Sequence, residues 1–204
     1  MTANNERHNA AESSFRRVVA AVALANLLYF FIEFFVARHI GSVSLFADSV
    51  DFLEDTALNV LILLALRRSE QTRARVGMVL AALILVPTAA VLWEAWHKLL
   101  RSEAPEAWLL SATGLGALVV NFACAAALAG FRHHKGSLTR AAFLSARNDV
   151  FANLAIIAAA LITLRWFSGW PDLLVGLAIS AMNADAALKV WKSARNEHAA
   201  AVAH

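Results

Sequence analysis

The sequence predicts an all-α integral membrane protein, a six-helix bundle with both termini in the cytoplasm. Of its 204 residues 60% are hydrophobic, and only 16% are charged. A soluble domain of this length needs more polar surface to cover itself. The charged residues are also grouped between long apolar stretches, which is typical of membrane-spanning chains. Cys124 is the single cysteine, which excludes a disulfide scaffold, and we interpret it as a small residue packed inside a helix.

Six apolar segments are each near the ~20 residues that a helix needs to cross about 30 Å of hydrocarbon. They cover residues 18–37, 43–66, 76–96, 108–131, 141–166 and 173–190. Short connections between them predict that consecutive helices pack as antiparallel neighbours. We therefore expect a tail over residues 1–17 with no cleaved signal peptide, a six-helix domain over 18–191, and a tail over 192–204 with no soluble C-terminal domain.

The basic residues that flank the segments predict the orientation of the bundle. Thirteen Lys and Arg residues fall on the side that carries both termini, and only four fall on the other side. Because cytoplasmic loops are enriched in Lys and Arg, both termini should be cytoplasmic in a multi-pass protein of the inner (plasma) membrane. The six tryptophans fall near segment ends, where an aromatic belt belongs. This distribution argues against nucleic acid as a partner, despite the net charge of +3.

The second segment contains acidic residues that are costly inside a membrane. At about 100° per residue, Asp51, Asp55 and Asn59 form one stripe, with Asp48 close to it and Glu54 nearby. Acids so close together repel one another, so they must be partly protonated or neutralised by bound cations. Asp48 has an alternative role near the start of its span, as a helix cap or a water-facing residue.

The fifth segment supplies a second polar stripe at spacings of four residues. It runs antiparallel to the second segment, so the two stripes can face each other and surround one ion with oxygen atoms. Carboxylates combined with amide or hydroxyl oxygens suit a divalent cation, and they suit a hard one better than a soft one. We therefore predict a metal site that consists of Asp51, Asp55, Asp149, Asn153 and Ser145.

Polar residues of the first segment can line a route to this site. Asn26 and Glu33 are seven residues apart and share one helix face with Tyr29. A carboxylate is the natural group to carry a proton, so the candidates for a proton or ion pathway are Glu33, Asp48 and Asn26. Asn26 can instead hydrogen-bond a neighbouring helix, as can Asn121 of the fourth segment.

Other charged residues of the segments are interpreted as structural. Glu94 and Lys98 are spaced as an i,i+4 pair near one surface, and Asp185 and Lys189 as another near the opposite surface. Arg147 lies on the far side of the fifth segment from the polar stripe. We expect it to reach the cytoplasmic surface or to pair with an acid of the second segment.

The second segment resembles the second-helix signature of the cation diffusion facilitator family. In that signature a small-residue stretch and Ala-Asp lead to a His or Asp, and a further Asp follows four residues later. Residues 41–55, GSVSLFADSVDFLED, have this form, which implies that Asp51 and Asp55 are metal ligands. The likeness covers the whole hydrophobic region. The other similar elements are Asn26 with Glu33 in the first helix and residues 170–179, WPDLLVGLAI, at the opening of the sixth.

Two features differ from the family pattern. The family's fifth helix usually has a His or Asp four residues before the Asp that matches Asp149, and Ser145 stands there in this chain. Asn148, Asn153 or a water would then supply the fourth oxygen. A histidine would favour zinc, whereas an oxygen-rich site could prefer manganese, iron, cobalt or cadmium. We also expect no cytoplasmic metallochaperone-like domain of the kind that is common in the family.

The resemblance implies an exporter that exchanges a cytoplasmic divalent cation for protons, without a resident cofactor. Metal and protons would compete for the carboxylates, and rocking helix pairs would give alternating access. The alternatives are a non-transporting metal sensor or a subunit of a larger complex. An enzyme is not expected. The seven histidines lie in termini, loops or segment ends, unlike those of a haem-binding bundle, and no Gly-x-Gly-Asp run of an intramembrane aspartyl protease occurs.

Family members generally act as dimers, which implies a homodimer here. A dimer formed within the membrane has to bury helix faces by close packing, because lipid gives no hydrophobic drive for association. The third segment offers an apolar ridge and the sixth offers small residues, so we expect the interface on these two. The residues are Val79, Leu83, Val86 and Ala90 of the third segment and Gly176, Ala178, Ser180 and Ala181 of the sixth.

Overall fold

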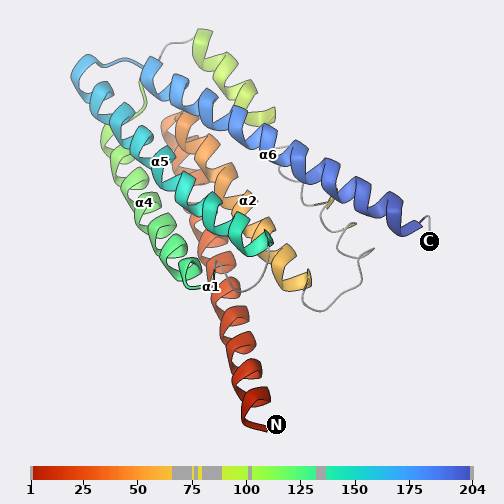
Figure 1. Cartoon of the computed structure of the whole chain (residues 1–204). Helices are drawn as coiled ribbons and strands as arrows, with labels where there is room; N and C mark the ends of the chain where they lie inside the picture. The colour runs from red at the N-terminus through yellow and green to blue at the C-terminus, as the bar shows by residue number, and fades with distance from the viewer. Residues whose placement is uncertain are drawn as a thin grey trace.

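The computed structural model describes residues 2–65, 75, 78–79, 89–100, 103–131 and 137–202. These residues are helical apart from short connections, and no strand occurs among them, so the predicted all-α fold is confirmed for this part of the chain. Figure 1 shows the helices as a bundle from which the N-terminal part of α1 projects. The helices are α1 (Thr2–Ile40), α2 (Val43–Ala65), α4 (Ala107–Ala129), α5 (Ser137–Trp166) and α6 (Trp170–Val202), with a further helical segment at 89–100.

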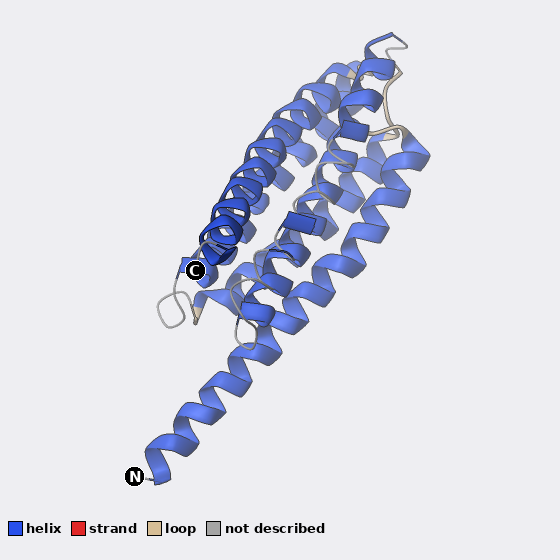
Figure 2. Cartoon of the chain, turned by 90° about the vertical axis from the view of Figure 1, so that its right-hand side faces the viewer, coloured by secondary structure: helices blue, strands red, loops and turns tan. Residues whose placement is uncertain are grey.

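The helices pack so that α2 lies at the centre of the described bundle. It contacts α1, α5 and α6 extensively, while α4 packs on α1 and α5. The start of α6 lies against the turn between α1 and α2, since Asp172 accepts a hydrogen bond from the backbone N–H of Val43. Both chain ends therefore lie toward the opposite end of the bundle (Figure 2). We call these two ends the turn end and the terminal end; the side of the membrane that each faces stays a prediction.

Three of the described helical stretches are long and apolar enough to cross a membrane, judged by length and composition. They are Glu12–Ile40, Ala107–Ala129 and Ser145–Trp166. α2 has a similar length but carries four acidic residues. Most of the predicted third segment, 76–96, lies outside the described residues. Large apolar side chains are exposed on several helices, which suits lipid rather than water; examples are Phe35, Trp108, Phe122, Phe151 and Leu174.

The turn between α1 and α2 is fixed by backbone and side-chain hydrogen bonds. Gly41 has a φ of +63°, and the N–H of Ser42 donates to the carbonyl of Ala37 at 3.0 Å. This is the Schellman pattern that ends a helix on a left-handed glycine. The hydroxyl of Ser42 then accepts a hydrogen bond from the N–H of Leu45 at 3.1 Å, as an N-cap residue does. α1 therefore ends and α2 begins within three residues.

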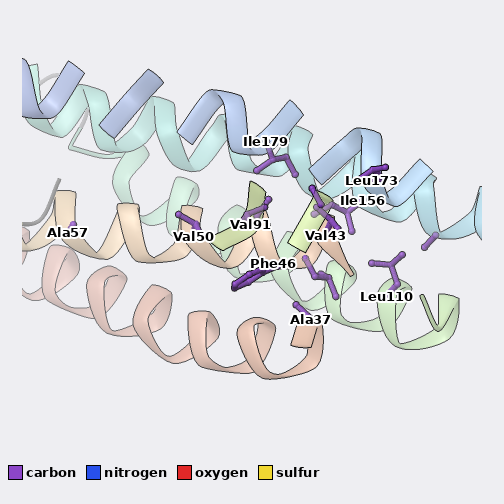
Figure 3. Close-up of a cluster of buried hydrophobic side chains, with 14 residues drawn as sticks. Ala37, Val43, Phe46, Val50, Ala57, Val91, Leu110, Ile156, Leu173 and Ile179 are labelled. Atoms are coloured by element: carbon purple, nitrogen blue, oxygen red, sulfur yellow. The ribbon is translucent and has the colours of Figure 1, made fainter. Parts of the chain in front are cut away.

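Two apolar clusters lie at different heights in the bundle. The cluster at the turn end contains Val43, Phe46, Val50, Ile156 and Leu173 among others and joins all the described helices (Figure 3). The second cluster lies toward the terminal end, between α1, α2, α4 and α5. The first cluster also extends along α2 through Val50 as far as Ala57, beside the buried acidic residues of that helix. The second cluster consists of the buried residues Phe15, Val19, Val22, Ile62, Cys124, Ala125, Leu128 and Ala146.

The expected dimer face on the sixth segment is partly wrong. Gly176 faces the interior of the subunit, because a Cβ added there would lie 2.6 Å from the backbone carbon of Val43. Ser180 is also buried, and its hydroxyl donates to the carbonyl of Gly176 at 2.7 Å. Ala178 and Ala181 are exposed, as are Val79 and Ala90, whereas Leu83 and Val86 lie outside the described residues. Small residues of α6 thus let it approach α2 closely, and the homodimer stays a prediction.

Candidate functional site

Asp55 of α2 and Asp149 of α5 come together inside the bundle. Only 2% of Asp55 and 8% of Asp149 is exposed. The carboxyl group of Asp55 lies close to the side chains of Asp149 and Ser145, and its Oδ1 has no hydrogen-bond partner among the described residues. The other oxygen, Oδ2, accepts a hydrogen bond from the side-chain amide of Asn26 at 3.4 Å. We call these four residues from α1, α2 and α5 the Asp55 layer.

A second polar layer lies nearer the turn end. Here the side-chain amide of Asn153 donates to both carboxylate oxygens of Asp48, at 3.0 and 2.8 Å. The carboxyl group of Glu33 lies close to that of Asp48, although neither of its oxygens has a hydrogen-bond partner among the described residues. All three residues are fully buried. We call Glu33, Asp48 and Asn153 the Asp48 layer.

The separation of the two layers follows from antiparallel packing of α1 on α2. Asn26 pairs with Asp55 and Glu33 with Asp48, so each helix advances seven residues between the layers. Seven residues are two helical turns, or about 10 Å along the axis. Asp51 lies between the layers and is half-buried, with carboxylates of both layers among its charged neighbours.

The predicted metal residues are thus brought to one region, but they do not form one closed site. Asn153 binds Asp48, one turn away from Asp149. In the part of the chain that the structure describes, no three His, Cys, Asp or Glu side chains are grouped so that they could hold a metal ion. The ligand roles of all five residues stay predictions.

The structure decides between two interpretations of Asp48. It is not a helix cap or a water-facing residue, because it lies five residues beyond the start of α2 and is fully buried.

Arg147 is exposed and points away from the layers, as expected, and it donates to the side-chain oxygen of Asn148 at 3.3 Å. Glu54 is half-buried beside Asp55. The described residues contain no ion pair between Arg147 and α2.

Cys124 of α4 borders the Asp55 layer, which the sequence analysis did not predict. It is buried, as expected of a residue packed inside a helix. Its thiol donates to the side-chain oxygen of Asn26 at 3.5 Å, and Asn26 in turn donates to Asp55. Asn121, one turn earlier on the same face of α4, is also buried. The spacing of Asn121 and Cys124 was the available signal that this face of α4 is turned toward α1.

A buried ion pair at the turn end was also missed. Asp172 of α6 accepts hydrogen bonds from the hydroxyls of Ser42 and Ser44, both at 2.6 Å, and from the ammonium of Lys98 at 2.6 Å. Lys98 also donates to the carbonyl of Gly41 at 2.7 Å. The predicted pairing of Lys98 with Glu94 is therefore wrong, since Glu94 pairs with Arg38 at 2.8 Å. The i,i+4 spacing suggested a pair within one helix, but Glu94 and Asp172 each pair with a basic residue of another helix.

Comparison with known families gives these layers a context. Residues 19–197 match the model of the cation efflux transmembrane domain family. This range includes both polar layers and the Asp172 ion pair. The chain belongs to the cation efflux family. This is the cation diffusion facilitator family that the second helix resembles, and its members are transporters rather than enzymes. No curated protein matches the chain. The protein is therefore a membrane protein of cation transport.

Proposed function

We propose that the protein exports a divalent transition-metal cation in exchange for protons and that the ion binds at the Asp55 layer together with Asp51. The observation that supports this most is the proximity of the buried carboxyl groups of Asp55 and Asp149, where Oδ1 of Asp55 has no hydrogen-bond partner among the described residues. Two ionised carboxylates repel each other at close range, so this proximity favours a proton or a cation bound between them. The ion pairs of the described residues are Arg38–Glu94 and Lys98–Asp172, and neither offsets this charge.

Competition between protons and the metal ion for this acidic pair would provide the exchange. An acidic pair in a poorly solvated site holds protons when it is empty, and a cation can bind only to the deprotonated form. Entry of the metal would therefore release protons, and return of protons would release the metal. Asp51 is half-buried beside the pair, so a change of its rotamer could add a third carboxylate to the ion. This competition is sufficient to couple export of the metal ion to entry of protons.

The donor set favours some metals over others. Ser145, which lies close to Asp55, has a hydroxyl at the position where an imidazole would favour zinc. The other donors of the layer are carboxylate and amide oxygens. We therefore propose manganese, iron, cobalt or cadmium as substrates ahead of zinc.

The apolar clusters on either side of the layers suit an alternating-access transporter. The part of the first cluster around Val43, Phe46 and Leu173 lies between the layers and the turn end, and the cluster around Val19 and Leu128 lies toward the terminal end. Each cluster would open in turn as helix pairs rock about the site. Because of the distribution of Lys and Arg, we place the terminal end in the cytoplasm, so the turn end is the exit.

The proposal is tested by reconstituting the purified chain into proteoliposomes that contain a metal-sensitive dye or a pH-sensitive dye. We expect metal entry to be accompanied by proton movement in the opposite direction, and a pH gradient alone to drive metal accumulation. A panel of manganese, cobalt, cadmium and zinc ions ranks the substrates. Metal binding without flux would favour the sensor alternative, and flux without proton movement would exclude antiport.

A further inference from the structure

Glu33 has an unusual environment for a carboxyl group. It is fully buried, and neither of its carboxylate oxygens accepts a hydrogen bond from any described residue. The carboxyl group of Asp48, which is also fully buried, lies close to it. A buried carboxylate without a donor is costly, and a second carboxylate beside it raises that cost. Neither ion pair of the described residues, Arg38–Glu94 or Lys98–Asp172, supplies a positive charge here, so a bound proton or cation would stabilise the arrangement.

Asn153 adds a third acceptor at the same place. Its amide nitrogen is occupied by Asp48, whereas its carbonyl oxygen is buried without a hydrogen-bond partner. Unpartnered acceptor oxygens thus come from α1 and α5, on either side of an Asp48 whose oxygens are held by Asn153. Carboxylate and amide oxygens are the ligands that hard and borderline divalent cations prefer.

We propose that the Asp48 layer is a second cation-binding site, through which the transported ion passes after it leaves the Asp55 layer. This inference rests on the proposed function, because it assumes that a divalent cation moves between α2 and α5. With two carboxylates and one amide oxygen, the site would hold the ion more weakly than a full protein cage and would leave room for water ligands. Weak binding suits an ion that has to leave.

The position of the layer supports a place on the exit route. It lies about 10 Å from the Asp55 layer toward the turn end. Asp51 lies between the two, close to the carboxylates of Asp149 and Asp48, and could pass an ion from one to the other. About one turn further toward the turn end, α1, α2 and α5 contribute Ala37, Leu45 and Ile156 to the apolar cluster with Val43 and Phe46. An ion at Asp48 would therefore be held directly beneath the closed exit, and repulsion from a following ion would favour its release.

Equilibrium binding of Mn²⁺ alone to the purified full chain in detergent tests this inference. The electron paramagnetic resonance signal of free Mn²⁺ gives the number of ions bound. We expect the wild type to bind one ion for each layer, Glu33→Gln to lose one of them, and Asp149→Asn to lose the other. The double variant should bind none. Glu94→Gln removes an exposed acid that pairs with Arg38, so it should bind as the wild type does.

The outcomes separate the two proposals. If the wild type binds a single ion that Asp149→Asn removes and Glu33→Gln leaves in place, the second site is refuted while the proposed function stands. If the wild type binds no ion, the proposed function itself fails. Should Glu33→Gln not fold, as judged by size-exclusion chromatography, Asn153→Asp decides the question. It adds a carboxylate and should tighten the weaker site by about tenfold or more; unchanged binding would overturn the proposal.

Discussion

Replacing Asp172 by Asn should destabilise the protein far more than a single surface charge change would. Asp172 is fully buried, and the side chain of Lys98 is only 7% exposed. The variant would leave the Lys98 ammonium buried without a counter-charge. It would also weaken the hydrogen bonds that Asp172 accepts from Ser42, Val43 and Ser44 at the start of α2. Breaking a buried pair by removing one partner costs about 3–5 kcal/mol.

The assay is thermal unfolding of the purified protein in detergent, with Glu94→Gln as the matched control. The Arg38–Glu94 pair has a similar length, 2.8 Å against 2.6 Å, but its side chains are 52% and 31% exposed. An exposed pair contributes roughly 0–1 kcal/mol. For a chain of this size about 1 kcal/mol lowers the melting temperature by roughly 2–4 °C. We therefore expect a fall of roughly 6–20 °C for Asp172→Asn and little change for Glu94→Gln.

Equal shifts in the two variants would refute this reasoning, because burial would then make no difference to the value of the pair. A further variant separates charge from lost packing. Lys98→Met removes the uncompensated ammonium, so in the Asp172→Asn background it should recover part of the stability. If the double variant is less stable than Asp172→Asn alone, the ammonium is not the source of the loss.

Three other substitutions follow from the same contacts. Ser145→Ala should weaken metal flux much less than Asp149→Asn, because a hydroxyl is a poorer ligand than a carboxylate, and equal losses in a flux assay would refute this ranking. Ser145→His should shift the relative flux toward zinc in a metal panel. Gly176→Ala should lower stability by about 1–3 kcal/mol, since its Cβ would lie 2.6 Å from the Val43 backbone. Gly130→Ala, with nothing within 4 Å, should not.

Much of the fold and part of the site could be predicted from the sequence because both depend on periodicity within single helices. The apolar segments gave the helices of the described bundle, and spacings of four and seven residues correctly placed Asp55, Asp149, Asn26 and Glu33 on inward faces. The antiparallel order of α2 and α5 was enough to bring Asp55 to Asp149.

What could not be predicted depends on the register between helices. Asn153 shares a stripe with Asp149, yet it binds Asp48, because the axial offset of α5 against α2 decides which turn faces which. Lys98 similarly binds Asp172, which is 74 residues away, rather than Glu94 four residues away. The buried carboxylate of Asp172 needs a counter-charge more than the exposed carboxylate of Glu94 does, because burial removes the stabilisation that water provides. Which acid is buried depends on how the helices pack, not on spacing within one helix.

The most direct test of the central claim is the rate of Mn²⁺ uptake by proteoliposomes that contain wild-type chain, Asp55→Asn or Arg147→Gln. Asp55 is one member of the buried acidic pair with Asp149, whereas Arg147 is an exposed charge on the other face of α5. We expect Asp55→Asn to abolish uptake and Arg147→Gln to retain it, with all three proteins reconstituted at equal density. Uptake by Asp55→Asn at the wild-type rate would contradict a cation route between α2 and α5.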